Sequence, residues 1–540
     1  MAESPRGTVV LVAQDSTENI GVRILLALLR REGHQAVLVP FCSDSEWLLR
    51  TVADLKPQLV GFSIIFQNLT DRFQEQMRDL RAAGVRAHLT AGGHFPSFAF
   101  ESLLRETRAL DSVVRFEGED TLLELTAALS SGDDWRGIEG LAWRDGDSIV
   151  ANPQRQGRRD LDTLPWPDRD DLDYGSGPLP TASLLGSRGC PHGCTFCSIA
   201  PFYRANGTPG RRFRRPVAVV DEMEWLHRRG ARVLLFQDDD FLGGGRRGVA
   251  WAHELAAEVI ARNLNENIRW RIACRSDEVT DDALRPLVEA GLVHVYLGVE
   301  SGDSQHLEDL GKNTTAERHL EAARTLTELG VGFDFGYMLL TPWSTFDTLR
   351  SNLAFVEEIS SGGLAAAGFC RTLPYAGTSI ADRLQTEGRL LPGCHADYLF
   401  NDPRLDSLWE WIYRTLNHRN QDPEGTRNLL SILLFESIVE LPGHPRNDGH
   451  LARLRSLARC SNELMFDVVE SAVDHVADHD KPLPQDDEYL VWLTGFHRTH
   501  DARIRTELEW ICRMRAHDNA SDLSGACHDT QAPGPTVLGA

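Results

Sequence analysis

Cys190, Cys194 and Cys197 lie close together in the run Gly189-Cys-Pro-His-Gly-Cys-Thr-Phe-Cys-Ser198, with Phe196 directly before the last cysteine. Three clustered thiolates can hold three irons of a [4Fe–4S] cluster, and the fourth iron is then left without a protein ligand. An iron with an open position can bind a small molecule and pass an electron to it. The spacing therefore predicts a redox-active iron–sulfur cluster.

Two other uses of clustered cysteines fit the sequence less well. A structural zinc site has four ligands, commonly in pairs with C-x2-C spacing, and no second pair follows this motif. A disulfide framework is typical of short secreted chains, whereas this chain has 540 residues, ten cysteines and no apolar signal segment at its start. The remaining cysteines are scattered, which indicates buried or incidental thiols: Cys42, Cys274, Cys370, Cys394, Cys460, Cys512 and Cys527.

A repeat of strand and helix begins directly before the motif. Six apolar strands alternating with amphipathic helices predict a partial βα barrel that is open on one side. In βα barrels the functional groups lie at the carboxyl ends of the strands, so we expect the cluster, whose loop follows the first strand, at the barrel mouth. The expected strands are 183–187, 232–237, 268–274, 294–299, 333–340 and 366–373, and the helices are 217–229, 249–265, 281–290, 316–329 and 345–359.

Residues 8–130 also alternate short apolar strands with helices of about 10–15 residues, which predicts a parallel, doubly wound α/β sheet. Such sheets bind ligands at the carboxyl ends of their strands. The loops there are small and polar, and Gly92 and Gly93 would let a bulky ligand approach the backbone. A dinucleotide is not favoured, because no G-x-G-x-x-G follows the first strand. The expected strands are 8–13, 36–40, 58–65, 86–91 and 112–116.

Together these features resemble the cobalamin (vitamin B12)-binding radical S-adenosylmethionine (SAM) enzymes, of the class B methyltransferase type. The cysteine spacing resembles the radical SAM superfamily, in which SAM binds the open iron. The segments that resemble a cobalamin domain are Pro57–Ser63, Ala91–Gly93 and Val113–Glu119. The resemblance implies three cofactors: a [4Fe–4S] cluster, SAM and cobalamin.

We expect five parts along the chain. A cobalamin-binding, flavodoxin- or Rossmann-like domain (1–135) is followed by a connector (136–180) that contains a hairpin with an Asp-Gly turn and a proline-rich stretch. A radical SAM partial (β/α)6 barrel (181–385) and a helical C-terminal domain (386–517) follow. The tail (518–540) is rich in Ser, Gly, Asp and Pro, which predicts disorder.

Residues at the predicted barrel strand ends match positions that hold SAM in this family. The aromatic residue before the last cysteine would pack near the adenine. Carboxylates after the second strand would balance the α-ammonium charge, and an arginine would pair with the SAM carboxylate. The alternatives are turn capping by the aspartates and a surface ion pair by the arginine. The candidates are Phe196, Asp238, Asp240, Arg275, Glu300 and Ser301.

Many cobalamin domains carry D-x-H-x-x-G, whose histidine ligates cobalt from below, but here Ser16 and Glu18 stand at the Asp and His positions. The resemblance then implies cobalamin without a histidine ligand, and His94 is favoured as a residue near the corrin edge rather than as a ligand. The alternative is a flavodoxin-like domain that only contacts a partner. The cobalamin-binding candidates are Ser16, Glu18, Gly21, Ser63, Gly92, Gly93, Glu117 and Gly118.

Two further groups have weaker chemical interpretations. His475 and His479 are spaced i, i+4, but Val476 stands where a zinc motif needs Glu, so a solvated helix end is favoured over a metal pair. The basic run at 211–215 favours a solvated loop over an anion site. Apolar residues at helical spacing predict C-terminal helices at 408–417, 426–439, 451–476 and 488–513.

The formal charge of −23, from 56 basic and 79 acidic residues, disfavours nonspecific binding to nucleic acid or to an anionic membrane. No apolar run reaches the roughly 20 residues that span a bilayer. We therefore expect a cytoplasmic protein, and we expect it to be a monomer. The family resemblance implies a small-molecule substrate and an external electron donor of the flavodoxin or ferredoxin type as its partners.

The reaction implied by the resemblance is C-methylation of an unactivated carbon, through a 5′-deoxyadenosyl radical, in an antibiotic-type secondary metabolite. Cobalamin would deliver the methyl group and a second SAM would replace it, while the protein supplies positioning. The alternatives are a cobalamin-dependent radical rearrangement or cyclisation without methyl transfer, and a B12-binding regulator. The intact cysteine triplet argues against the regulator.

Overall fold

The structure is a computed structural model that describes residues 7–522 except 16–17, 43, 175–178, 394–395 and 443–447, with the side chains of 515–522 left out. The chain forms two compact units. The first contains Met1–Leu172, Ser183–Glu222 and Leu373–Tyr398, and the second contains Asp173–Ala182, Met223–Thr372 and Leu399–Ala540. The units group the segments differently from the five expected parts, whose boundaries stay a prediction.

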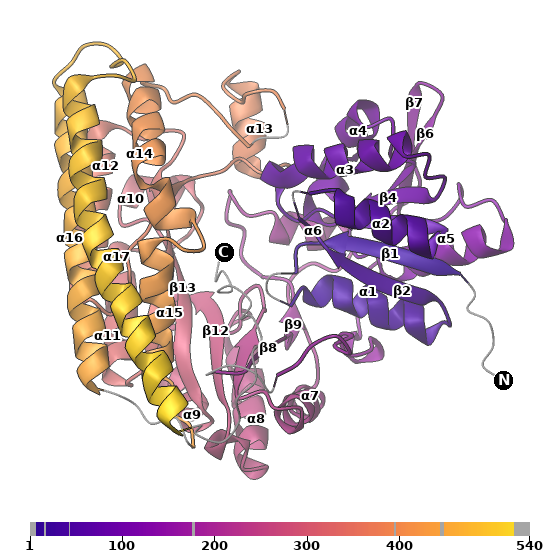
Figure 1. The fold of residues 1–540 in the computed structure, drawn as a ribbon, viewed down its shortest axis with the longest axis horizontal. Helices are drawn as coiled ribbons and strands as arrows, with labels where there is room; N and C mark the ends of the chain where they lie inside the picture. The colour runs from indigo at the N-terminus through magenta and orange to yellow at the C-terminus, as the bar shows by residue number, and fades with distance from the viewer. Residues whose placement is uncertain are drawn as a thin grey trace. The chain divides into compact units, whose positions relative to one another are not determined.

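The first unit is built on a seven-stranded sheet of order β2-β1-β3-β4-β5-β6-β7. The first five strands in this order are parallel, and β6 and β7 add an antiparallel hairpin. The doubly wound fold expected from the alternating pattern is confirmed (Figure 1). The strands are β1 (Thr8–Ala13), β2 (Gln35–Pro40), β3 (Leu59–Ser63), β4 (His88–Gly92), β5 (Ser112–Val114), β6 (Leu141–Asp145) and β7 (Ser148–Ala151).

Helices cover both faces of this sheet. Helices α2 (Glu46–Leu55), α3 (Thr70–Ala82) and α4 (His94–Glu106) bury leucine and phenylalanine side chains against one face. Helices α1 (Ile20–Arg31) and α5 (Glu119–Ser131) pack on the other. Burial of both faces explains why the strands read as continuous apolar runs.

The segment that carries the cysteines belongs to the first unit. It contains β9 (Ser187–Arg188), α6 (Ile199–Ala205), β10 (Arg212–Phe213) and the start of α7 (Pro216–Arg228). The single strand expected at 183–187 is instead two short strands, β8 (Thr181–Leu184) and β9. Helices α6 and α13 (Ser379–Thr386), also in this unit, were not expected from the sequence.

The second unit contains the parallel strands of the expected half barrel, in a sheet of order β15-β14-β13-β12-β11-β8. The boundary between the units falls inside β8. Of the last expected strand, 366–373, only the two residues of β15 (Cys370–Arg371) form a strand. The other strands are β11 (Val233–Phe236), β12 (Arg269–Arg275), β13 (Leu292–Glu300) and β14 (Gly332–Leu340), and the helices that follow them are α8 (Arg246–Ala261), α9 (Asp281–Glu289), α10 (Ser304–Asp309), α11 (Ala316–Glu328) and α12 (Phe346–Ser360).

Four C-terminal helices complete this unit: α14 (Pro403–Gln421), α15 (Thr426–Ile438), α16 (Asp448–Ala477) and α17 (Glu488–Asp522). Helices α15, α16 and α17 share a core of leucine and isoleucine side chains. Helix α17 is drawn to Asp522, and residues 523–540 lie outside the described residues, so the expected disorder of the tail from 518 stays a prediction.

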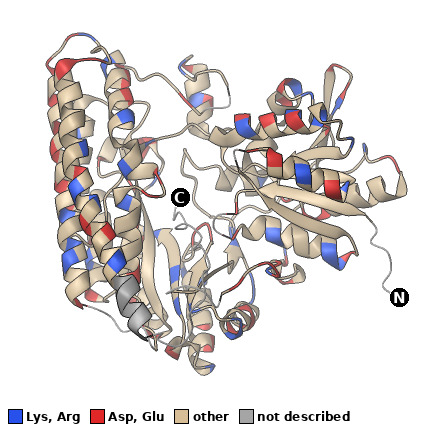
Figure 2. Ribbon diagram, in the orientation of Figure 1, with Lys and Arg blue, Asp and Glu red and all other residues tan. Residues whose placement is uncertain are grey.

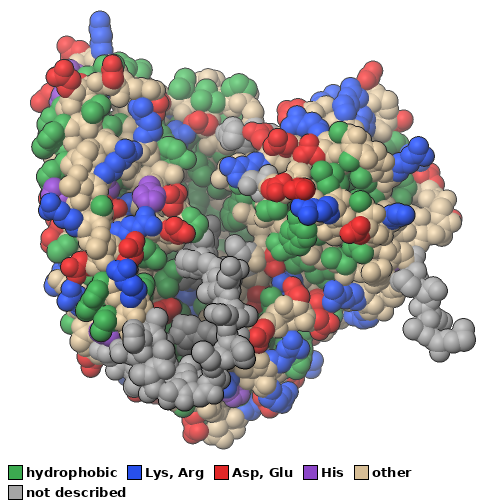
Figure 3. All heavy atoms as spheres, viewed as in Figure 1, with side chains coloured by type: hydrophobic (Ala, Val, Ile, Leu, Met, Phe, Trp, Pro, Cys, Tyr) green, Lys and Arg blue, Asp and Glu red, His purple; other side chains and the backbone are tan. Residues whose placement is uncertain are grey.

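The outer surface of α16 and α17 mixes side chains of opposite charge (Figure 2). Hydrophobic side chains also lie between charged ones on the surface of the molecule (Figure 3). The exposed large hydrophobic residues of α17 include Trp492 and Phe496. Within the described part of the chain, no helix has the length and apolar character needed to cross a membrane.

Candidate functional site

The loop between β9 and α6 places Cys190, Cys194 and Cys197 in a half-exposed segment, and the structure gives all three as thiols. The Cys197 amide donates to the Cys194 carbonyl over 3.2 Å, and the Ile380 amide donates to the Thr195 carbonyl over 3.2 Å. These bonds close and anchor the loop. Three partly accessible thiols on one short loop are the donor set that a three-cysteine [4Fe–4S] cluster requires.

Gly189 allows the close approach of backbone at the base of this loop. Its φ is +91°, and a Cβ there would come within 2.1 Å of the Gly210 carbonyl oxygen. Both the positive φ and the short distance exclude a side chain. The glycine before the first cysteine is therefore required by the backbone path.

The cobalamin-binding candidates that the structure describes lie after parallel strands of the first sheet. Ser63 ends β3 and pairs in register with Gly92, which ends β4. Gly93 has a φ of +105°, and a Cβ there would lie 2.6 Å from the Ile64 carbonyl oxygen. A glycine surface at the carboxyl end of a parallel sheet fits a flat, bulky ligand such as a corrin ring. Gly118 precedes α5, Gly21 lies in α1, and Ser16 lies outside the described residues.

Glu18, at the position where many cobalamin domains have histidine, is held in a buried ion pair. Its carboxylate accepts a hydrogen bond from Arg169 Nε over 3.0 Å. Arg169 also donates to Glu222 over 2.8 Å and to the Ser183 carbonyl over 2.6 Å. Arg169 of the connector therefore holds Glu18 in a structural ion pair. Position 18 has no imidazole that could ligate cobalt.

Glu117, another cobalamin-binding candidate, is the centre of a buried charge cluster. Its carboxylate accepts hydrogen bonds from Arg188 over 2.8 Å, from Arg212 over 2.7 Å and from Asn206 over 2.6 Å. Arg188 also pairs with Glu119 over 2.7 Å. Burial alone would raise the pKa of Glu117, but Arg188 and Arg212 outweigh it and hold the pKa below its ordinary value. The cluster ties the loop after β5 to the segment that flanks the cysteines.

The basic run at 211–215 is part of this packing, so the expectation of a solvated loop is wrong. Arg212 binds Glu117, and Arg214 donates to Glu222 over 2.6 Å. Arg211 is buried, donates to Ser187 Oγ over 2.7 Å and stacks on a phenylalanine ring. Only Arg215, among these four, is largely exposed.

His94 makes a second connection to the cysteine segment. Its ring stacks on Phe202 with centroids 4.2 Å apart, and Nδ1 lies 3.4 Å from Ser198 Oγ, next to Cys197. Burial lowers the pKa of His94 to about 4, so the ring is neutral. This arrangement gives His94 a packing role beside the cysteine loop.

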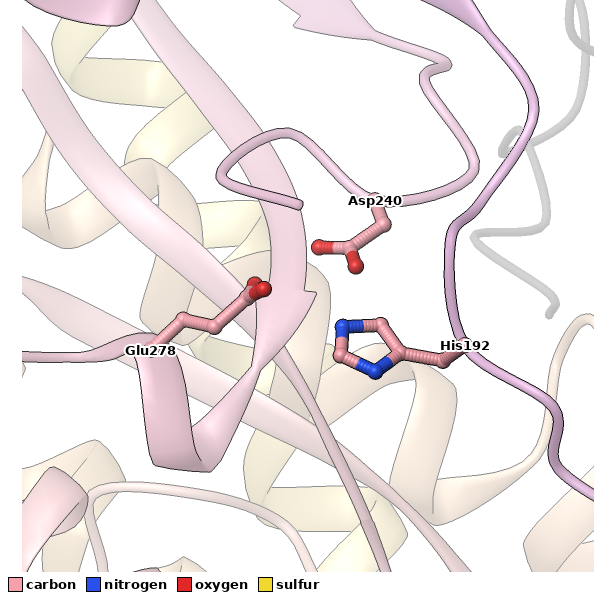
Figure 4. A group of neighbouring side chains, drawn as sticks. All are labelled: His192, Asp240 and Glu278. Carbon is pink, nitrogen blue, oxygen red and sulfur yellow. The ribbon is translucent and has the colours of Figure 1, made fainter. Parts of the chain in front are cut away.

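The SAM-binding candidates fall in both units: Phe196 lies on the cysteine loop of the first, and the others lie in the second. Asp238 and Asp240 follow β11 and are buried. Figure 4 shows the carboxylates of Asp240 and Glu278 pointing toward a shared space. An oxygen of one lies within 4.8 Å of an oxygen of the other, and Glu278 ends a short 3-10 helix after β12. A concentration of carboxylates fits the α-ammonium group of SAM.

Arg275 and Glu300 are joined through a lysine that the sequence did not single out. Lys312 is buried, and its Nζ donates to Glu300 Oε1 over 3.3 Å. The Arg275 guanidinium binds Asp277 with two bonds of 2.9 Å and also donates to the Lys312 carbonyl. Gly298 leaves room for this lysine, because a Cβ there would lie 2.8 Å from Lys312 Nζ. The alternative of a surface ion pair is wrong for Arg275, which is buried.

A buried polar network holds the turn after β13. Ser301 Oγ donates to Asn352 Oδ1 over 2.7 Å, and the same oxygen accepts from the amides of Gly302 and Asp303 over 3.0 and 3.1 Å. Asn352 also contacts the His306 ring nitrogen over 2.6 Å. Glu300 has a φ of +70°, a strained conformation for a residue with a side chain, and this network fixes it.

Thus Asp238 and Asp240 follow β11, Arg275 ends β12, and Glu300 and Ser301 lie at the end of β13. These three strands are neighbours in the sheet. Their roles toward SAM stay a prediction. Sequence reasoning missed Lys312, Glu278 and Asn352, because each is defined by a contact with a distant part of the chain. His475, a member of the weak histidine pair, binds Asp487 over 3.0 Å, as a helix-end side chain would.

Comparisons with known proteins match both halves of this arrangement. The B12 binding domain family model matches residues 6–126, and the Radical SAM superfamily model matches residues 184–349. An uncharacterized methyltransferase of Pyrococcus horikoshii is 25% identical over 71% of this chain and 82% of its own length. The anaerobic magnesium-protoporphyrin IX monomethyl ester cyclase of Cereibacter sphaeroides is 29% identical, over 56% of this chain and about half (50%) of its own length.

Among solved structures, the cobalamin-dependent SAM radical enzyme OxsB, with aqua-cobalamin and SAM bound, aligns with a TM-score of 0.68. The alignment covers 97% of this chain and 81% of that one at 18% identity, so this likeness shows the fold alone. With both family models matched on the sheets described above, the chain belongs to the radical SAM enzymes that carry an N-terminal B12 binding domain, and its cofactors are a [4Fe–4S] cluster, SAM and cobalamin.

Proposed function

We propose that this enzyme is a C-methyltransferase that acts on an unactivated carbon of a small molecule. The observation that carries the proposal is the ion pair of Glu18 with Arg169, which occupies the position of the usual cobalt ligand. The chain would hold cobalamin without a histidine ligand from position 18, and cobalamin bound in this way would supply the methyl group. The methyltransferase relative from Pyrococcus horikoshii supports the same reaction class.

When bound, the cluster and SAM supply hydrogen-atom abstraction, and cobalamin supplies the methyl group. The residues of the chain bind, orient and shield these groups. The cysteine loop holds the cluster, and Arg275, Glu300 and Ser301 orient SAM, with Lys312 and Asn352 fixing their positions. The glycines after β4 admit the corrin, and electrons come from an external donor of the flavodoxin or ferredoxin type.

The second candidate is a radical rearrangement or cyclisation without methyl transfer. The cyclase from Cereibacter sphaeroides favours it, because that relative covers more than half of this chain. A B12-binding regulator is the least favoured alternative, since a regulator needs neither the cysteine loop nor buried strand-end carboxylates.

The test is a substrate-free methyl-transfer assay on the reconstituted enzyme with a low-potential reductant and SAM. A methyltransferase forms S-adenosylhomocysteine only when cobalamin is present. The variant with Cys190, Cys194 and Cys197 all changed to Ala still forms S-adenosylhomocysteine when cobalamin is reduced chemically. That variant forms no 5′-deoxyadenosine. Absence of S-adenosylhomocysteine from the cobalamin-loaded wild-type enzyme would refute the proposal.

A further inference from the structure

The inner strands of the half barrel carry a row of polar side chains on one face. In register, Arg271 lies opposite His294, Ala273 opposite Tyr296, and Tyr296 opposite Asp334. Because side chains alternate along strands, these positions project from the same side of the sheet. Helix α15 packs along this side, where Ser431 Oγ contacts Asp334 over 3.3 Å and Phe435 lies 5.2 Å from the His294 ring.

Arg271 and Tyr296 have polar groups that no described residue uses. The Arg271 guanidinium lies 5.5 Å from the centre of the Tyr296 ring, and neither side chain makes a hydrogen bond or ion pair with the described part of the chain. Both keep part of their surface accessible although they stand on the central strands. Gly298 and Gly336 lie on the same face, have no side chain to cover it and are both half-buried.

Arg427, in the first turn of α15, reaches the same face. A Cβ on Gly368, close to β15, would lie 2.5 Å from Arg427 Nε, so this glycine makes room for the arginine. Arg427 Nε is buried without a hydrogen-bond partner among the described residues, and the guanidinium donates to Asn428 Oδ1 only over a long distance of 3.5 Å. Burial has the largest effect on the pKa values of Arg271, Tyr296 and Cys370, and the positive charge of Arg427 lowers all three. Arg427 therefore lies near these side chains.

The nearby carboxylates balance only part of this charge. Glu300 binds Lys312, and Asp334 contacts Ser431 and the neutral ring of His294. Burial lowers the pKa of Arg271, and the charge of Asp334 opposes that shift. One carboxylate beside two guanidinium groups leaves a positive charge that is costly to bury unless an anion enters with the ligand. Guanidinium groups and a phenol hydroxyl are donors that match the oxygens of a carboxylate or a phosphate.

We propose that Arg271, Tyr296 and Arg427 form an anion-binding subsite that takes a carboxylate or phosphate group of the substrate. The inference rests on the proposed function, of which it names the substrate class. The subsite lies on the barrel face, whereas the SAM-binding candidates follow the strand ends. The subsite selects small anionic substrates as methyl acceptors. The affinity for SAM depends instead on Arg275 and Glu300.

The test is titration calorimetry of the reconstituted enzyme, with phenyl phosphate and phenylacetate as separate probes. We expect one probe to bind in a single site, and Arg271→Gln and Arg427→Gln each to raise its dissociation constant at least tenfold. Gly368→Ala, which displaces Arg427 without changing charge, has the same effect. Arg318→Gln, which removes an exposed arginine from α11, leaves the constant unchanged, and circular dichroism checks the fold of each variant.

The comparison of the two probes decides between phosphate and carboxylate. Equal probe affinity in the wild type and in folded Arg427→Gln, or no binding to the wild type, would overturn the subsite. A raised dissociation constant for SAM in Arg427→Gln, with probe binding intact, would also overturn it. If the enzyme transfers no methyl group but the probe still binds through the arginines, the proposed function is refuted and the subsite stands. The two claims can therefore fail separately.

Discussion

Cys190, Cys194 and Cys197 carry the prediction that depends least on the rest of the molecule. Replacing any one of them by Ala removes one of three iron ligands, so we expect cluster loading to fall to a small fraction of the wild-type level. Iron and sulfide analysis with the visible absorbance of the anaerobically reconstituted protein measures this. Cys460→Ala, on the exposed surface of α16, is the control and keeps full loading. Undiminished cluster absorbance in Cys194→Ala would show that the ligands are elsewhere.

Glu117 allows a test of the charge cluster that flanks the cysteine loop. Glu117→Gln removes the carboxylate that Arg188 and Arg212 share, and Arg212 is then left buried without a charged partner. Breaking a buried pair in this way costs about 3 kcal/mol, so chemical denaturation of the apoprotein should occur at lower denaturant concentration by a corresponding amount.

The control for this variant is Glu46→Gln, because Glu46 pairs with Arg50 on the surface of α2. An exposed pair contributes at most about 1 kcal/mol. The cluster also fixes Arg188 two residues before Cys190, so Glu117→Gln should broaden the electron paramagnetic resonance signal of the reduced cluster, whereas Glu46→Gln leaves it unchanged. Equal stability of the two variants would contradict the assigned role of Glu117.

Helix α12 supports the end of β13 through Asn352, and the effect of that contact is measurable as SAM binding. Asn352→Leu keeps the branching of the side chain but removes the oxygen that accepts from Ser301 Oγ and from the amides of Gly302 and Asp303. The two amides keep Tyr337 Oη and Ser301 Oγ as acceptors, whereas the buried Ser301 hydroxyl loses its acceptor, at about 1–3 kcal/mol. The turn that carries Glu300 and Ser301 then loses its fixed geometry. We expect the dissociation constant for SAM to rise about tenfold, while the exposed change Asn401→Leu has no effect. Unchanged SAM affinity in Asn352→Leu would remove this turn from the SAM site.

Helix α17 carries a buried histidine that gives the C-terminal helices a defined pH dependence. Burial, and then the charge of Arg419, lowers the pKa of His497 to about 3 from 6.5, and neither ring nitrogen has a partner among the described residues. The folded state therefore keeps the ring neutral while the unfolded state gains a proton below pH 6.5. Stability is full above that pH and is lost as the pH falls, by about 2 kcal/mol at pH 5.

His497→Phe removes the proton-binding group and should abolish that part of the loss, which thermal unfolding at pH 7 and pH 5 measures. His479→Phe, a change at an exposed histidine that follows α16, is the control and leaves the pH dependence in place. An identical pH dependence in His497→Phe and the wild type would show that other groups control it.

The element boundaries show where periodicity is informative. Strands β12, β13 and β14 are buried and flanked by glycine or capped helices, and their expected bounds are close to the observed ones. The strand expected at 366–373 is mostly irregular, because an apolar run of that length also suits backbone that packs beneath helices: Ala367 binds Asn462 and Arg419 of the helical region. The apolar pattern of this segment therefore predicts that its residues are buried, but it does not predict that they pair as a strand.

For the whole molecule, the alternation of strands and helices was sufficient to predict both α/β sheets, and the cysteine motif was sufficient to predict the iron–sulfur cluster. SAM and cobalamin followed from the resemblance to the cobalamin-binding radical SAM enzymes. They placed Ser63, Gly92 and Arg275 at strand ends, because that position follows from strand order alone. They could not predict that Glu117 binds Arg212, or that Lys312 binds Glu300. Such pairs depend on which loops the folded backbone brings together, and polar loop residues have no periodicity that reveals a distant partner.

The proposed reaction consumes two molecules of SAM for different purposes, and the products record both. The most direct measurement is quantitative mass spectrometry of S-adenosylhomocysteine, 5′-deoxyadenosine and methylated product, with wild-type enzyme, cobalamin, reductant and a panel of small anionic acceptors. The account predicts that the accepted substrate yields all three in equal amounts, with the methyl group derived from labelled SAM. Turnover that gives 5′-deoxyadenosine and an altered substrate, without S-adenosylhomocysteine or a transferred methyl group, would contradict it.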